Sequence, residues 1–274
     1  GGLQQHRHRR LPGARHHGDQ RAGRADRDHR RLRLRADDAD ALAYLANMLC
    51  VVGQFEAAVS YHERALAITQ LKSNHTDVAA ALSNLGLAWE ARGDFPKAIS
   101  CHEKALKISR EAMGEKHPDV AAHLNNLSNA YAKLSKLHKA IECDEQALSI
   151  IQQHIYDARH LERQATVLSN LGNRWDALGN FHQAIHYHQR SLDLQRRRLG
   201  DQHPDVAKVL LNLGSTWFAL GEFNKALNFY EEALKINQQV YGAQHHIVAM
   251  NLGNIGNVWE ALGKFQKAIF YYEQ

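Results

Sequence analysis

Apolar residues recur at spacings of three and four along most of the chain, which is the pattern of helices with one buried face. One block, Leu-x-Asn-Leu-Gly-x-x-Trp with variations, occurs five times, and a weaker copy begins at Leu42. Successive copies start 40 to 44 residues apart. The pattern therefore predicts an all-α protein built from about six copies of one unit. The five clear copies begin at Leu82, Leu124, Leu168, Leu210 and Leu252.

Each block is followed by a turn and a second helical segment. The turn has a glycine and then an aromatic residue, as at Gly93 and Phe95, and an alanine such as Ala98 follows. A glycine of this kind is typical of a helix C-terminus. The unit is therefore a helical hairpin. Repeats are expected over 38–75, 76–117, 118–160, 161–203, 204–246 and 247–274, with the sixth incomplete and the array continuing beyond it.

Small and large residues stand at fixed positions of the repeat. Glycines such as Gly86 and alanines such as Ala98 are expected to let helices approach closely, and large side chains to fill the remaining space. All the tryptophans fall at one repeat position, which predicts a place in the hairpin core. They are Trp89, Trp175, Trp217 and Trp259.

These residues resemble the tetratricopeptide repeat. The period near 42 residues and the connectors Gly114-Glu-Lys-His-Pro-Asp-Val120 and Gly200-Asp-Gln-His-Pro-Asp-Val206 are similar to those of the kinesin-light-chain-like subclass. The resemblance covers residues 38–274 and implies an α-solenoid, a right-handed superhelix of about six hairpins. Ser128 in place of the glycine and Leu49 in place of the aromatic residue depart from the pattern.

In such a superhelix the first helices of the hairpins line the concave face, and asparagines occupy two positions expected to face the groove. The basic residues expected to face the groove are Lys133 and Lys208. The first asparagine column is Asn84, Asn126, Asn170, Asn212 and Asn254, and the second asparagine column is Asn47, Asn129, Asn173 and Asn257.

An asparagine amide has donors and an acceptor, so it can pair with the main chain of an extended peptide. The family resemblance implies that the first asparagine column lines a peptide groove. The alternative is that these amides bond neighbouring helices instead. The paired basic residues of chaperone-binding tetratricopeptide domains are missing, since Ser83, Asn125 and Ser169 stand at those positions.

The first 36 residues form an Arg/His/Gly-rich tail without helical periodicity. The tail has eleven of the 34 basic and three of the 29 acidic residues, a net charge of +8 against −3 for the rest. We expect this tail to be disordered, and its composition also fits an out-of-frame or non-native segment. A basic tail could attract nucleic acid, but the acidic body argues against nucleic acid as the partner.

The remaining signals indicate a cytoplasmic, non-enzymatic protein that binds a protein or peptide segment. No apolar run is long enough to cross a membrane, and three scattered cysteines are typical of reduced thiols. No catalytic, cofactor or metal motif is found, and His182, His186 and His188 have no accompanying ligand cluster. The alternative function is the sensor or autoinhibitory array of a larger signalling enzyme, such as an NTPase with flanking domains.

Overall fold

The computed structural model describes residues 38–71, 74–153 and 158–274, and the regular elements among them are all helices. The tail over 1–36 lies outside the described residues. The prediction of an all-α solenoid of six hairpins is confirmed. The helices are one over residues 38–51, α2 (Phe55–Gln70), α3 (His75–Arg92), α4 (Phe95–Met113), α5 (Pro118–Lys133), α6 (Leu137–Gln153), α7 (Ala158–Ala177), α8 (Phe181–Leu199), α9 (Pro204–Ala219), α10 (Phe223–Tyr241), α11 (His246–Ala261) and α12 (Phe265–Glu273).

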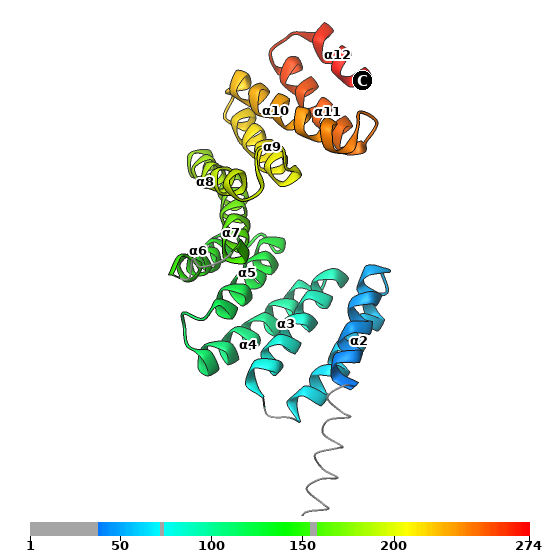
Figure 1. Cartoon of the computed structure of the whole chain (residues 1–274), viewed down its shortest axis with the longest axis vertical. Helices are drawn as coiled ribbons and strands as arrows, with labels where there is room; N and C mark the ends of the chain where they lie inside the picture. The colour runs from blue at the N-terminus through cyan, green and yellow to red at the C-terminus, as the bar shows by residue number, and fades with distance from the viewer. Residues whose placement is uncertain (1–37, 72–73, 154–157) are drawn as a thin grey trace, which may run out of the picture.

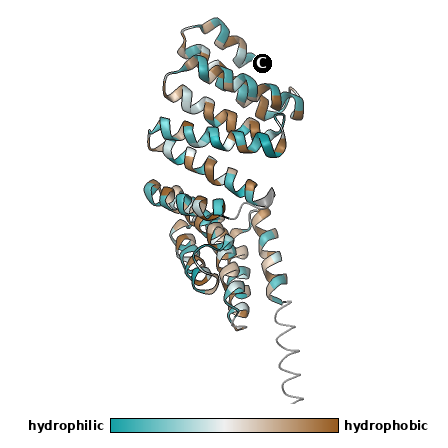
Figure 2. Cartoon of the chain, turned by 60° about the vertical axis from the view of Figure 1, so that its left-hand side comes forward, coloured by the Kyte–Doolittle hydropathy of each residue, from teal (hydrophilic) through white to brown (hydrophobic). Residues whose placement is uncertain are grey.

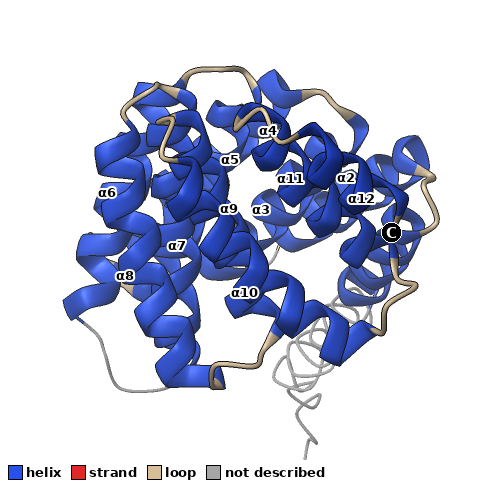
Figure 3. Ribbon diagram, turned by 90° about the horizontal axis from the view of Figure 1, so that it is seen from above, coloured by secondary structure: helices blue, strands red, loops and turns tan. Residues whose placement is uncertain are grey.

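Consecutive helices from α2 to α12 pack on one another, so the hairpins stack into a superhelix (Figure 1). Seen from above, α3, α9 and α11 lie near the superhelix axis, while α6, α8 and α10 lie outside (Figure 3). Polar and apolar residues alternate around each helix (Figure 2). The first helices of the hairpins therefore form the inner wall, as the repeat pattern predicts.

Within a hairpin, the block glycine accommodates a ring from the second helix. A Cβ atom built on Gly172 would lie 2.7 Å from Nε2 of His188, and one built on Gly214 would lie 2.5 Å from Cε1 of Tyr230. His188 and Tyr230 are buried. The glycine is thus required because an aromatic ring occupies the space of its missing side chain.

The tryptophans lie at the edge of the hairpin core. Trp89 is buried, whereas Trp175, Trp217 and Trp259 are half-buried and pack on the core clusters. In three hairpins a lysine from the second helix lies over the indole at 4.1 to 4.2 Å, as Lys97 does over Trp89. The predicted core role holds for Trp89, whereas the other three tryptophans pack on the core and remain partly exposed.

Turn residues fix the hairpin ends. The histidine of the His-Pro-Asp connector caps the next helix, since Nδ1 of His117 accepts from the main-chain N–H of Asp119, and His203 repeats this with Asp205. At the turn inside each hairpin the chain adopts positive φ, usually at a glycine such as Gly93. In the third hairpin Ser135 takes this position with φ 57, which costs more than it would for glycine.

The buried apolar residues do not form one continuous core. One cluster includes residues from α2 to α7, such as Val59 and Leu171. A second includes Ile185 of α8 together with residues of α9 and α10, and a third includes Tyr230 of α10 and Ile255 of α11. The core is therefore divided along the superhelix.

Candidate binding groove

Three amide groups of the first asparagine column bridge adjacent hairpins. Nδ2 of Asn126 donates to Oγ of Ser83 at 3.0 Å, and Nδ2 of Asn212 donates to Oδ1 of Asn173 at 3.1 Å. Nδ2 of Asn170 donates to Oδ1 of Asn125 at 3.1 Å. The amide nitrogens therefore bond neighbouring hairpins, which is the alternative that the sequence left open. All three residues remain half-buried.

Hollows lie between successive first helices on the inner wall. The hollow between the helix over 38–51 and α3 has a volume of about 210 Å³, and Asn84, Asp40 and Asp77 are among the residues that line it. The hollow between α5 and α7 has about 310 Å³, and that between α7 and α9 about 230 Å³. Each has about the volume of one or two side chains.

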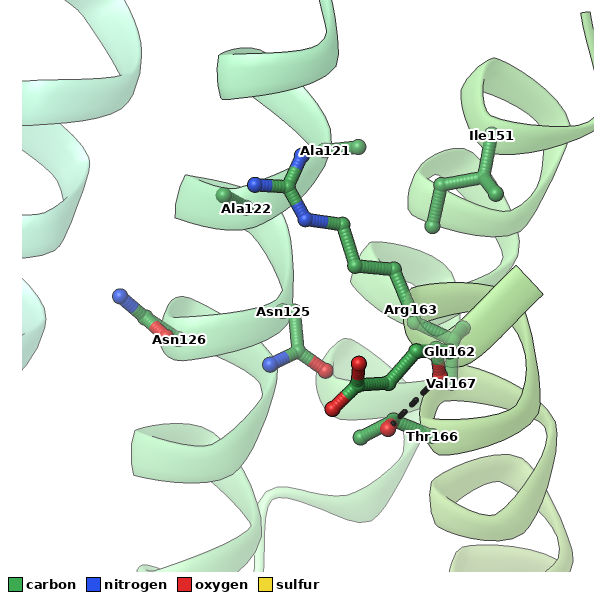
Figure 4. Close-up of a pocket in the computed structure, with 9 residues that line it drawn as sticks. All are labelled: Ala121, Ala122, Asn125, Asn126, Ile151, Glu162, Arg163, Thr166 and Val167. Atoms are coloured by element: carbon green, nitrogen blue, oxygen red, sulfur yellow. Dashed lines mark hydrogen bonds between the residues drawn. The ribbon is translucent and has the colours of Figure 1, made fainter. Parts of the chain in front are cut away.

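The hollow between α5 and α7 combines an apolar floor with polar edges (Figure 4). Ala122, Ile151 and Val167 supply the apolar surface, and Asn125 supplies an amide. Arg163 extends from α7 across the space toward α5 (Figure 4). A partner side chain that enters this hollow would contact the apolar floor beside the charged groups of Arg163 and Glu162.

The other predicted groove residues are distributed unevenly. Asn173 and Lys208 line the hollow between α7 and α9, and Lys133 is exposed near the end of α5. Asn254 is half-buried on α11, and Oδ1 of Asn257 accepts from the Tyr272 hydroxyl at 2.8 Å. The structure thus brings Asn126, Asn129, Asn170, Asn173 and Asn212 together over α5, α7 and α9.

A buried ion pair that the repeat pattern did not predict joins the third and fourth hairpins. Nε of Arg174 lies 2.8 Å from Oδ2 of Asp144, and the two side chains are 7% and 0% exposed. Nε of Arg174 also donates to Oγ of Ser128 at 3.0 Å. The signal in the sequence was a departure from the repeat: Ser128, Asp144 and Arg174 replace the glycine, the ring and the small residue found elsewhere.

Burial dominates the electrostatics of this cluster. It raises the pKa of Asp144 to about 7, although the positive charge of Arg174 and the Ser128 hydroxyl lower it. Burial also lowers the pKa of Arg174, and Asp144 raises it. A carboxylate enclosed this far is stable as an anion only while the guanidinium stays beside it.

Buried histidines give the solenoid a second set of titrating groups. Burial lowers the pKa of His188 from 6.5 to about 4, and it also lowers the pKa values of His62 and His123. Because the folded state favours neutral His188, its contribution to stability is complete above pH 6.5 and is lost as the pH falls toward 4.

Replacing His188 by Tyr should therefore reduce the acid sensitivity of the protein. Tyr occupies the equivalent position in Tyr230 and Tyr272, where it also packs on a glycine. From about pH 7.5 to about pH 5, wild type should lose about 2 kcal/mol more unfolding free energy than His188→Tyr. Denaturant titrations at both pH values measure this difference, and equal losses would show that His188 does not titrate in this range.

The remaining candidate groups do not assemble into a reactive site. His188 is buried, whereas His182 and His186 are exposed. Among the described residues no cluster of three His, Cys, Asp or Glu side chains is placed to hold a metal, and Cys50, Cys101 and Cys143 are free thiols. No helix in the described part is long and apolar enough to cross a membrane.

Comparison with known proteins places the repeats in a family. The tetratricopeptide repeat model matches residues 37–98, 77–153, 163–239 and 218–274. BtubC (BKLC) from P. vanneervenii is 25% identical with a TM-score of 0.65, over 88% of each chain. A Podosopora anserina kinesin light chain with nearly identical TPR-like repeats is 21% identical with a TM-score of 0.65, over 75% of this chain and 98% of its own.

The fold is also shared more widely, and no curated protein matches the chain. The apo form of RapI is 16% identical with a TM-score of 0.69, over 85% of this chain and 64% of its own. The family model covers most of the described residues, and the hairpins have the predicted geometry. The chain belongs to the tetratricopeptide repeat family, and structures with kinesin-light-chain-like repeats are among those that share its fold.

Proposed function

We propose that this protein is a non-enzymatic interaction scaffold that binds an extended peptide or protein segment along its inner wall. The observation that carries the proposal is the row of hollows between successive first helices, edged by asparagine amides. Amides in the second asparagine column and the free oxygens of the first can pair with a peptide main chain. The hollows can accept side chains of that segment.

Charge also favours a peptide over a strongly charged polymer. The side chains of the second asparagine column are neutral. Four residues further along each first helix stand small residues such as Ala177 and Ala219, and Lys133 is the charged side chain at that position.

The charges that line the hollows are of both signs, since Arg163 and Lys208 lie beside Glu162 and Asp205. The inner wall therefore lacks the uninterrupted row of cations that binds a phosphate backbone. The same groove would act as a sensing surface if the array is joined to a signalling enzyme.

Filling the hollow between α5 and α7 should block binding without unfolding the protein. Ala122 is half-buried on α5 and Thr166 is exposed on α7, so Ala122→Trp places an indole in the hollow and leaves the bridging amides intact. Peptides selected on the wild-type chain from a random phage-displayed library serve as the probe. Their affinity should fall about tenfold or more, equivalent to about 1.4 kcal/mol.

The matched control is Glu142→Trp, which adds the same side chain to an exposed position on the outer helix α6. This variant should bind the selected peptides as wild type does. Equal affinity of the Ala122→Trp variant would place the peptide elsewhere, and failure to select any peptide from the library would contradict a peptide-binding groove.

A further inference from the structure

Arg174 forces one orientation on a groove amide. A guanidinium group has N–H donors and no acceptor. Nη2 of Arg174 donates to Oδ1 of Asn129 at 2.7 Å, and Nη1 donates to the main-chain oxygen of Asn170 at 3.0 Å. The atom of Asn129 that faces Arg174 must be its oxygen, because the opposite orientation would bring two donors together.

The orientation of Asn129 then determines that of Asn170. Nδ2 of Asn170 lies 3.5 Å from Oδ1 of Asn129 and 3.1 Å from Oδ1 of Asn125. Both neighbouring atoms are acceptors, so Asn170 must direct its nitrogen toward α5. The groups left for the groove are the Nδ2 donor of Asn129 and the Oδ1 acceptor of Asn170, and both residues are partly exposed.

Neighbouring junctions do not impose this direction. Between the fourth and fifth hairpins Asn212 pairs amide to amide with Asn173, and the pair is equally satisfied if both amides turn over. Between the second and third hairpins Asn126 bonds the hydroxyl of Ser83, which can donate or accept. Arg174, whose side chain has donors only, contacts the amide bridge between the third and fourth hairpins. The partners in the other two bridges, Ser83 and Asn173, can each donate or accept.

We propose that Arg174 is a positioning residue that fixes the donor of Asn129 and the acceptor of Asn170 toward the groove. Asp144 holds the guanidinium in place through the buried ion pair. An extended main chain offers C=O and N–H groups in a fixed order along its direction. The groove at this junction therefore fits an extended segment that places a main-chain carbonyl at Asn129 and a main-chain N–H at Asn170. This proposal rests on the proposed function.

The first test measures the amides without a ligand. A triple variant, Ser128→Gly with Asp144→His and Arg174→Thr, installs the residues found at Gly86, His102 and Thr216 in other hairpins. Nuclear magnetic resonance relaxation of the side-chain amide of Asn129 should give an order parameter above about 0.8 in wild type and below about 0.6 in the variant. The amide of Asn212 should not change. Equal order of Asn129 in both proteins would overturn the positioning role.

The second test uses peptides selected from a random phage-displayed library on the wild-type chain. Asn129→Asp keeps an acceptor for Arg174, removes the Nδ2 donor and adds one negative charge beside the guanidinium, so the fold should be kept while affinity falls about tenfold. Asn228→Asp, with the same charge change at an exposed position of the outer helix α10, should bind normally. The triple variant should also lose about tenfold.

The outcomes separate the two proposals. If Asn129→Asp binds the selected peptides with unchanged affinity, the donor at Asn129 is not used and the positioning proposal is wrong. If no peptide can be selected, the proposed function fails, and the relaxation measurement still decides whether Arg174 orders the amide. Should the triple variant not fold, Asn129→Asp decides the question alone, with its melting temperature as the control.

Discussion

Replacing Arg174 alone with Thr, the residue at the equivalent position 216, is expected to lower the unfolding free energy by about 3 to 5 kcal/mol. The change leaves Asp144, whose side chain is 0% exposed, without its charged partner. Chemical denaturation followed by circular dichroism at neutral pH measures the loss. The deficit should shrink at pH 5, because Asp144 has a raised pKa and is protonated there.

The compensated triple variant with Ser128→Gly and Asp144→His should recover most of this stability. It replaces the ion pair by a histidine ring packed on a glycine, as His102 packs on Gly86. Ala132 stands where Glu90 bonds His102, so the new histidine lacks that carboxylate partner. Replacing a buried ion pair as a whole is often neutral, whereas removing one partner is not. A triple variant less stable than Arg174→Thr would show that this junction cannot accept the common arrangement.

Adding one methyl group at Gly172 is expected to destabilise the fourth hairpin by about 2 to 3 kcal/mol. A Cβ atom there would lie 2.7 Å from Nε2 of His188, which is 1% exposed and enclosed by packed side chains. The ring therefore cannot move away without displacing its neighbours. Denaturant unfolding of Gly172→Ala measures the cost.

The control is Gly253→Ala, a helical glycine at which a Cβ atom would meet nothing within 4 Å. Alanine is the better helix former, so this variant should gain up to about 1 kcal/mol. The two identical substitutions should therefore shift stability in opposite directions. A neutral or stabilising Gly172→Ala would mean that His188 does not occupy the space above the glycine.

Much of the architecture follows from the repeat pattern, because the same local interactions recur in every hairpin. The turn at Gly93, the second helix that begins near it and the position of Asn170 on the inner wall could all be expected from spacing alone. The pattern could not predict that the amide nitrogen of Asn170 bonds the preceding hairpin. That contact depends on how closely two hairpins stack, which periodicity does not specify.

The buried cluster was missed for a different reason. A repeat pattern is defined by what its copies share, so it does not include residues that occur in one copy only. Asp144 and Arg174 are such departures, thirty residues apart in two different copies. Each alone resembles a tolerated surface substitution, and only their contact in three dimensions explains both. Ser128 was recognised as a departure, but its role as an acceptor for Arg174 required the junction geometry.

The division of the apolar core has a consequence for how the protein opens. In a solenoid, stability is the sum of hairpin terms and nearest-neighbour terms, so a gap in the core lowers the coupling across it. Helices α2 to α7 share one large cluster, against which Tyr187 and Leu194 of α8 also pack, while α9 to α11 rely on smaller clusters. Thermal fluctuation should therefore release the C-terminal hairpins as a separate cooperative unit, with amide protons there exchanging with solvent while those of α5 remain protected.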